Sequence, residues 1–180
     1  ALYTLLQCGV GRQHPAVQRA VAYLDSCEPT QTYATTTMLL AYDALRDGRE
    51  DRITKFVENL LLWQKPGGDW AYPHGTPDLS CTQYAALGLY IGQKHGITID
   101  PSHFLDLFES LEDYCGGVEK IANPFVNGER TGAAKVNIAG YGYRRHDDNQ
   151  KCTGSMTTAA LAVMQICKAG LGRKLRGGIR

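Results

Sequence analysis

Apolar residues recur at helical spacing in three segments that each keep a polar opposite side. In residues 14–26 the apolar positions follow i, i+3, i+4 and i+7, and residues 50–64 and 100–114 repeat this stripe. Pro15 and Pro101 stand where a first helical turn would begin, a position that proline favours. The pattern predicts three amphipathic helices, each with one face buried and one face in water.

Four further segments carry almost no charge through their middles and are rich in alanine, threonine and glycine. They are residues 1–11, 33–48, 79–96 and 154–170. When the last three are aligned, Leu40, Leu87 and Leu161 coincide, which indicates an internal repeat. A helix that is apolar or small all round is typical of one surrounded by other helices. We therefore expect these segments to form inner helices that are covered on all sides.

Inner and outer helices that alternate along the chain predict an all-α fold, an α/α toroid in which antiparallel helical hairpins form two layers. A helical bundle or a solenoid of hairpins has the same local pattern and remains an alternative. Because only four inner and three outer segments are present, we expect an incomplete ring. Residues 116–151 are too many for a bare turn and include β-prone stretches, so they predict a long loop or a small β-hairpin.

The composition is that of one globular domain over residues 1–180, because 43% of the residues are hydrophobic and 21% are charged. A net charge of +1 gives no field that would favour nucleic acid as a partner. No apolar run reaches the roughly 18 residues of a transmembrane helix. Residues 172–180 are basic and are predicted to be a flexible tail. The chain starts at Ala1 and not at Met, so we expect a processed or excised piece, and the localisation stays open.

The six cysteines form no C-x-x-C pair, and most of them lie in apolar or helical segments. In such places cysteine is usually a small buried hydrophobic residue, which is what we predict here. Disulfide bonds remain an alternative for an exported protein.

The segment LLLWQKPGGDWAYP resembles the glutamine, glycine and tryptophan repeat of squalene and hopene cyclases through Gln64, Gly68 and Trp70. Bacterial squalene-cyclase-like and prenyltransferase-like repeat proteins also have helices and turns similar to HPAVQRAVAYL, DLSCTQYAALGL, GYGYRR and GSMTTAALAVMQIC. The resemblance implies a double-layered toroid of six hairpins. An incomplete ring would expose the apolar flanks of its terminal inner helices, which implies association through these open edges or with further domains of a longer chain.

In the family's cyclases an acidic D-x-D-D sequence at the start of an inner helix protonates an alkene, and aromatic rings stabilise the cation. The corresponding residues here are Asp78, Leu79, Ser80 and Cys81, so Asp78 alone remains as a catalytic candidate. The same residue can instead cap the following helix. Protein prenyltransferases of this fold bind zinc through Asp, Cys and His, which makes His74, Asp78 and Cys81 candidate ligands, although their spacing differs from the family's. No cofactor is favoured, and zinc stays possible.

Aromatic residues near two turns are candidates for the lining of a pocket. They are Trp70, Tyr72, Tyr84, Tyr141 and Tyr143, together with His74. For the first turn the resemblance implies a structural role, in which Gln64 bonds to a neighbouring turn and Trp70 packs below it. We interpret Gln64, Gly68 and Trp70 as a corner brace and the stretch from His74 to Tyr84 as the part that lines a site. Other polar residues are interpreted as an exposed turn (His146, Asp147, Asp148, Cys152) and as helix-end residues without partners (His14, His95, His103).

The leading functional prediction is a helical toroid domain that binds an apolar, isoprenoid-like molecule or a peptide at its concave end, without an intact acid motif. One alternative is an active isoprenoid cyclase or a zinc-dependent prenyl transferase. Another is a protein-interaction scaffold. The sequence does not identify the ligand.

Overall fold

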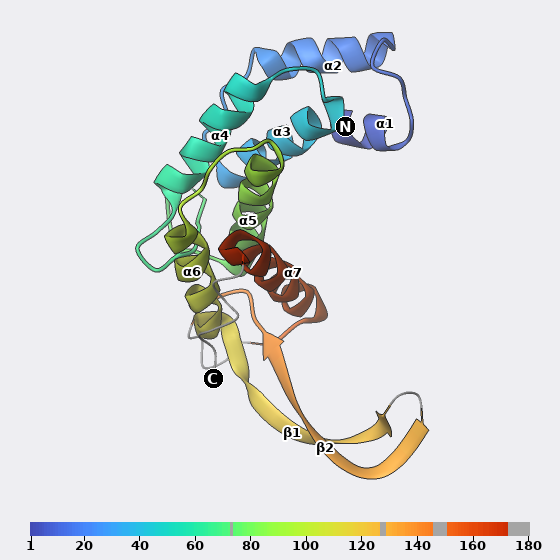
Figure 1. Ribbon diagram of the computed structural model, residues 1–180, viewed down its shortest axis with the longest axis vertical. Coiled ribbons are helices and arrows are strands. Elements are labelled where there is room, and N and C mark those ends of the chain that lie inside the picture. The colour runs from blue at the N-terminus through green and yellow to red at the C-terminus, as the bar shows by residue number, and fades with distance from the viewer. Residues whose placement is uncertain (73, 127–128, 146–150, 173–180) are drawn as a thin grey trace.

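A computed structural model describes residues 1–72, 74–126, 129–145 and 151–172 of the chain (Figure 1). These residues form seven α-helices, one 3₁₀ helix and one two-stranded antiparallel sheet. The protein is therefore mostly helical with one small sheet. This agrees with the expected all-α class and with the expected hairpin.

Three amphipathic helices line the outer, convex side of a curved arrangement (Figure 1). They are α2 (Pro15–Asp25), α4 (Glu50–Trp63) and α6 (Pro101–Ser110). Two of them start with a side-chain cap: Nδ1 of His14 accepts from the backbone N–H of Ala16 at 3.1 Å, and Oδ1 of Asp100 accepts from that of Ser102 at 2.8 Å. These caps satisfy N–H groups that have no partner inside the helix, so the helices begin close to the expected residues.

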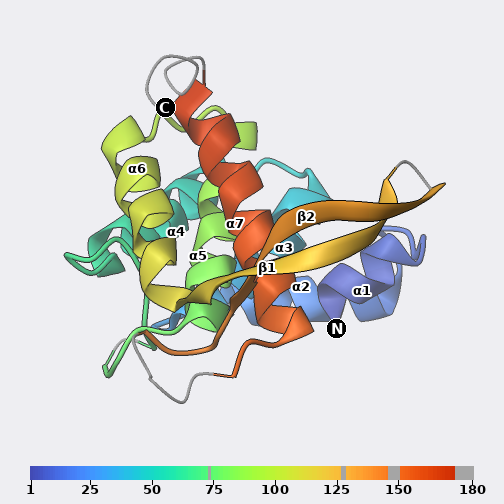
Figure 2. The same ribbon diagram turned by 90° about the horizontal axis from the view of Figure 1, so that it is seen from below.

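The charge-poor segments form the inner helices α1 (Leu2–Gln7), α3 (Thr32–Leu45), α5 (Leu79–Lys94) and α7 (Gly154–Leu171). Along this layer α1 packs on α3, α3 on α5, and α5 on α7. Figure 2 shows α5, α6 and α7 running side by side. The segments around Leu40, Leu87 and Leu161 are therefore neighbours in space, as the internal repeat requires.

Glycines let the two layers approach closely. A Cβ atom on Gly88 would lie 2.3 Å from Cδ1 of Leu60, and one on Gly170 would lie 2.5 Å from the ring of Phe104. Because only hydrogen fits at these positions, α4 packs directly against α5, and α6 packs directly against α7. The core consists of the apolar residues between the layers, which are almost all buried.

The prediction that every inner helix is covered on all sides is wrong for α1, of which only Leu2 is buried, and for α7. Leu161 on this helix is 52% exposed, whereas Val163 is fully buried. The described residues place no helix beyond α7, and its exposed positions are Gly154, Ser155, Thr158, Leu161, Gln165, Lys168 and Ala169. Leu161 is therefore the one large apolar side chain that α7 leaves in solvent among the described residues.

The expected hairpin follows α6 through the 3₁₀ helix η1 (Leu111–Tyr114). Its strands are β1 (Cys115–Val126) and β2 (Glu129–Tyr141), which pair from Cys115↔Tyr141 to Val126↔Glu129. The hairpin projects from the helices and packs on α7 through β2 (Figure 1). Of the predicted basic tail, residues 173–180 lie outside the described residues. No helix in the described ranges combines the length and the apolar character that a membrane span needs.

Candidate ligand-binding site

The turn after α4 is held by Gln64 and Gly68. The Gln64 amide nitrogen donates to the backbone oxygens of Gly68 and His103, both at 3.0 Å, and its amide oxygen bonds the ring of His103. Gly68 has a φ of +86°, and a Cβ atom there would lie 2.0 Å from the backbone oxygen of Asp106 on α6. The turn therefore requires glycine at this position, and Gln64 connects it to the first turn of α6.

Trp70 lies in the core beneath this turn and is fully buried. Its indole N–H donates to the backbone oxygen of Leu60 at 2.7 Å, and its backbone N–H donates to Oγ1 of Thr82 at 3.1 Å. These bonds tie the end of α4 to the first turn of α5. Trp70 therefore stands in a structural position, and its ring has no surface on which a ligand could bind.

Asp69 is a fully buried carboxylate that the sequence analysis did not single out. Its Oδ2 accepts from the hydroxyl of Tyr114 at 2.6 Å and lies 2.6 Å from Nε of Arg145. Burial raises the pKa of Asp69, although Tyr114 and Arg145 act in the opposite direction. The only signal in the sequence is an acid placed between Gly68 and Trp70, which gives no indication of its distant partners.

A cluster of four tyrosines lies at the N-terminal end of α5. The ring of Tyr33, on α3, stacks on Tyr72 with centroids 5.5 Å apart and contacts Tyr84 in a tilted arrangement with centroids 4.1 Å apart, and its hydroxyl bonds Oγ of Ser80. Tyr143, the fourth ring, belongs to the segment beside this end of α5, where its backbone oxygen accepts from the N–H of Leu79 at 3.1 Å. We call Tyr33, Tyr72, Tyr84 and Tyr143 the tyrosine cluster. Three of its members were predicted to line a site, and Tyr33 was missed.

Asp78 is 2% exposed and caps α5 beneath the tyrosine cluster. Its Oδ1 accepts from the backbone N–H of Cys81 at 2.7 Å. Burial and, after it, the Asp78 carboxylate raise the pKa of Tyr143 to about 12 and that of Cys81 to about 12. Asp78 is therefore a helix cap and also the negative charge of this cluster.

An apolar groove of about 660 Å³ adjoins the cluster at Tyr33. One wall is formed by Ala20, Tyr23 and Leu24 of α2 with Cys27 just after it, and the other by Ala34, Thr37, Met38 and Ala41 of α3. The start of α1 closes one side. The residues of each wall are spaced i, i+3, i+4 and i+7, which places them on one side of their segment.

The candidate zinc ligands do not fit a metal site. In the part of the chain that the structure describes, no three side chains of the types His, Cys, Asp and Glu lie close enough to hold an ion. His74 is exposed, whereas Asp78 and Cys81 are buried. A cysteine that binds zinc does so as a thiolate, and in the metal-free protein burial raises the pKa of Cys81 to about 12.

The remaining candidates lie elsewhere. Tyr141 is half-buried at the base of the hairpin, where its backbone N–H donates to Oγ1 of Thr157 at 3.1 Å. His146, Asp147 and Asp148 of the second polar cluster lie outside the described residues, and Cys152 is exposed. The expected burial of the cysteines holds for Cys81 and Cys167 but is wrong for Cys8 and Cys152.

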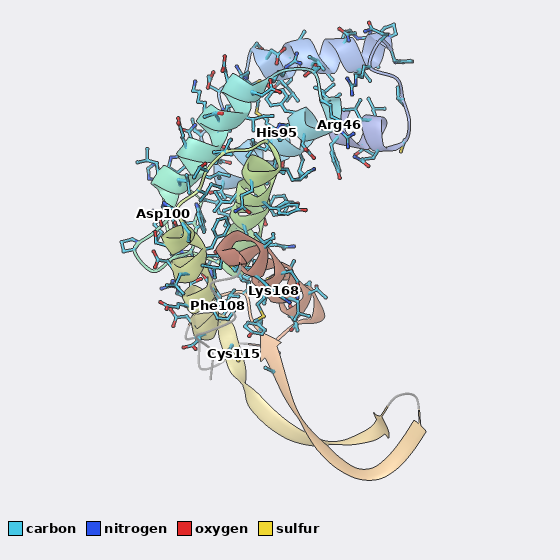
Figure 3. The ribbon with its side chains drawn as sticks, in the orientation of Figure 1. Arg46, His95, Asp100, Phe108, Cys115 and Lys168 are labelled. Carbon is cyan, nitrogen blue, oxygen red and sulfur yellow. The ribbon has the colours of Figure 1, made fainter. Side chains whose placement is uncertain are left out.

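Two histidines have partners that the sequence did not predict. His95, at the end of α5 (Figure 3), places Nε2 3.1 Å from Oδ1 of Asp43 on α3. His103 bonds Gln64, as described above. The prediction that these residues lack a cooperating group is therefore wrong, because the partners come from elements that are distant in the sequence.

No protein-family model matches the chain, and no curated protein is significantly similar to it.

Proposed function

We propose that the chain is a helical repeat domain of the α/α-toroid type that binds an apolar, isoprenoid-like molecule in the groove between α1, α2 and α3. The alternation of inner and outer helices supports the toroid part of the proposal. The corner brace of Gln64, Gly68 and Trp70 supports a relationship to squalene-cyclase-like and prenyltransferase-like repeat proteins.

The observation that carries the proposal is the chemistry of the groove. Its volume of about 660 Å³ falls in the range of small-molecule sites, which is about 300–1,000 Å³. No charged side chain lines it, and its polar groups are hydroxyls, an amide and a thiol. An apolar chain would remove this surface from water without leaving a charge unpaired. The volume favours a small molecule over a peptide.

A displacement assay tests this proposal. Nile red, a neutral apolar dye, should bind one site per chain, and farnesol, a neutral isoprenoid alcohol, should displace it. Ala34 is exposed on the α3 wall of the groove, so Ala34→Phe should fill the site and abolish binding at little cost in stability. The matched control is Ala169→Phe, at an exposed position of α7 outside the groove. Binding that survives in Ala34→Phe would contradict the proposal.

A second candidate function is acid catalysis on an isoprenoid double bond. The observation that favours it is the position of Asp78, a buried carboxylate beside tyrosine rings. Against it, Oδ1 of Asp78 accepts a 2.7 Å hydrogen bond from the backbone N–H of Cys81, which gives this carboxylate a structural role as the cap of α5. Turnover of squalene or farnesyl substrates that disappears in Asp78→Asn would support this candidate.

A further inference from the structure

The carboxylate of Asp78 lies near the rings of Tyr33, Tyr72 and Tyr143. Among the ion pairs that the described residues form, none includes Asp78. Tyr72 and Tyr143, two rings of the tyrosine cluster, are 43% and 40% exposed. Aromatic faces attract cations, and a nearby carboxylate adds to this attraction. The rings and the carboxylate together therefore favour a positive charge at the surface of the cluster.

Arg144 shows that a cation is accepted at this surface. Its guanidinium carbon lies 5.5 Å from the centroid of the Tyr143 ring. The side chain is exposed, and its guanidinium donates a 3.4 Å bond to the backbone oxygen of Thr76. A bond of that length holds the guanidinium weakly. Arg144 is thus an occupant that a ligand with a better-fitting cation can displace.

The tyrosine cluster and the groove meet at one residue. Tyr33 lines the groove and also forms the centre of the ring stack with Tyr72 and Tyr84. An apolar chain in the groove would therefore end beside the cluster. This geometry brings an uncharged apolar surface next to a surface that attracts cations.

We propose that the ligand is an amphiphile whose head group is an alkylated ammonium cation, with the apolar chain in the groove and the head on the tyrosine cluster. This inference rests on the proposed function, since the chain of the ligand occupies the same groove. An alkylated ammonium suits the cluster because it sheds water more readily than a bare ammonium and needs no hydrogen-bond acceptor. An anionic head would face the Asp78 carboxylate and is disfavoured.

Three probes with the same apolar chain test the head group: octyltrimethylammonium, octanol and octyl sulfate, each below the concentration at which it forms micelles. Affinities are measured by titration calorimetry. The ammonium should bind about tenfold more tightly than octanol, which corresponds to one cation–π contact reinforced by a charge. Octyl sulfate should bind most weakly.

Two substitutions test the charges at the tyrosine cluster while the fold is kept. Asp78→Asn should remove the preference for the cation while α5 stays capped, because asparagine caps a helix as well as aspartate does. Arg144→Gln should raise the affinity for octyltrimethylammonium by several-fold, because it removes the competing guanidinium. Tyr90→Leu, at an exposed tyrosine of α5 outside the cluster, is the control and should change nothing.

The position of the probe's apolar chain is measured separately through Cys27, which lines the groove and is half-buried. In a variant with Cys8, Cys115 and Cys152 replaced by serine, a bound probe should protect Cys27 from maleimide. If octanol protects Cys27 and binds as tightly as the ammonium, or if Asp78→Asn leaves the preference intact, the head-group inference is overturned and the proposed function stands. If no probe protects Cys27, the proposed function itself fails.

Discussion

The hydroxyl of Tyr114 donates a 2.6 Å hydrogen bond to Oδ2 of Asp69, a carboxylate with no exposed surface. Nε of Arg145 lies 2.6 Å from the same oxygen. Tyr114 directly precedes β1, and Arg145 follows β2 by a few residues. One buried carboxylate in the turn after α4 therefore contacts residues at both ends of the projecting hairpin. It connects the turn that contains the corner brace to the hairpin.

The first prediction concerns the hydrogen bond itself. Tyr114→Phe keeps the buried ring but removes a donor from a buried carboxylate, which should lower the free energy of unfolding by about 1–3 kcal/mol. Urea denaturation followed by circular dichroism measures this change. Tyr90→Phe removes a hydroxyl from a tyrosine that is 40% exposed, and it should change stability by less than about 0.5 kcal/mol. Equal effects of the two substitutions would contradict the role given to Tyr114.

The second prediction concerns pH. Burial raises the pKa of Asp69, whereas the pKa of an aspartate in an unfolded chain is about 3.9. Between these two values the folded protein binds more protons than the unfolded chain, so the contribution of Asp69 to stability falls as the pH rises. Asparagine does not titrate. The stability of Asp69→Asn relative to the unsubstituted protein should therefore rise as the pH increases above about 4.

Urea unfolding at several pH values measures this trend. Asp106→Asn, at an exposed position in the middle of α6, is the control and should show no such trend. If Asp69→Asn instead loses relative stability as the pH rises, the ion pair with Arg145 outweighs the cost of burial, and the direction assigned to the pKa is incorrect.

A third prediction separates close packing from backbone conformation at two glycines. Gly68 and Gly96 both have positive φ, +86° and +78°, but only Gly68 has a neighbouring atom where a Cβ would go, 2.0 Å away on Asp106. Gly96→Ala should cost about 1–2 kcal/mol from the left-handed conformation alone. Gly68→Ala should cost about 3 kcal/mol or more, because α6 must also move. Similar melting temperatures for the two variants would mean that the turn does not pack on α6 in this way.

The helices could be predicted from the sequence because their signals are local. The segment 14–26 was expected to be a helix, and α2 runs over Pro15–Asp25. Stripe spacing, proline at the first turn and a capping side chain all lie within a few residues of each other. The hairpin was expected over residues 116–151 from length and β-prone composition, and its strands lie within Cys115–Tyr141.

The candidate site could be predicted only in part, because its geometry depends on contacts between distant segments. In the sequence Tyr33 is an uncharged residue of a predicted inner helix and has no feature that marks it. In the structure it lines the groove and its ring contacts Tyr72 and Tyr84. Asp69 reads as a turn residue, yet it is buried against Tyr114 and Arg145. Periodicity reports which face of a helix is buried, and it does not report which residues of other hairpins that face meets.

A fourth prediction concerns the reactivity of the cysteines. Cys81 and Cys167 are fully buried, and burial raises the pKa of each to about 12. The thiolate is the reactive form, so both should stay unmodified by iodoacetamide at about pH 8 in the folded protein. Cys8 and Cys152 are exposed and should react. Peptide mass spectrometry after timed alkylation measures each rate, and modification of Cys81 as fast as Cys8 would show that the first turn of α5 opens readily.

The last prediction concerns the open side of α7. Leu161 is 52% exposed, whereas Leu89 on α5 is fully buried. Leu161→Ala should therefore change the free energy of unfolding by less than about 1 kcal/mol, while Leu89→Ala should cost about 2–5 kcal/mol. A large cost at Leu161 would mean that this face is covered in solution by another surface.

The same face should drive association when the protein is concentrated. Leu161, the exposed large apolar side chain of this face, gains free energy when a second apolar surface covers it. Sedimentation analysis across a range of concentrations should show self-association that Leu161→Lys weakens, since a lysine would have to be desolvated at the contact. The matched control is Leu62→Lys, which places the same charge at an exposed leucine of the outer helix α4. If both variants associate like the unsubstituted protein, the flank of α7 is not the contact surface.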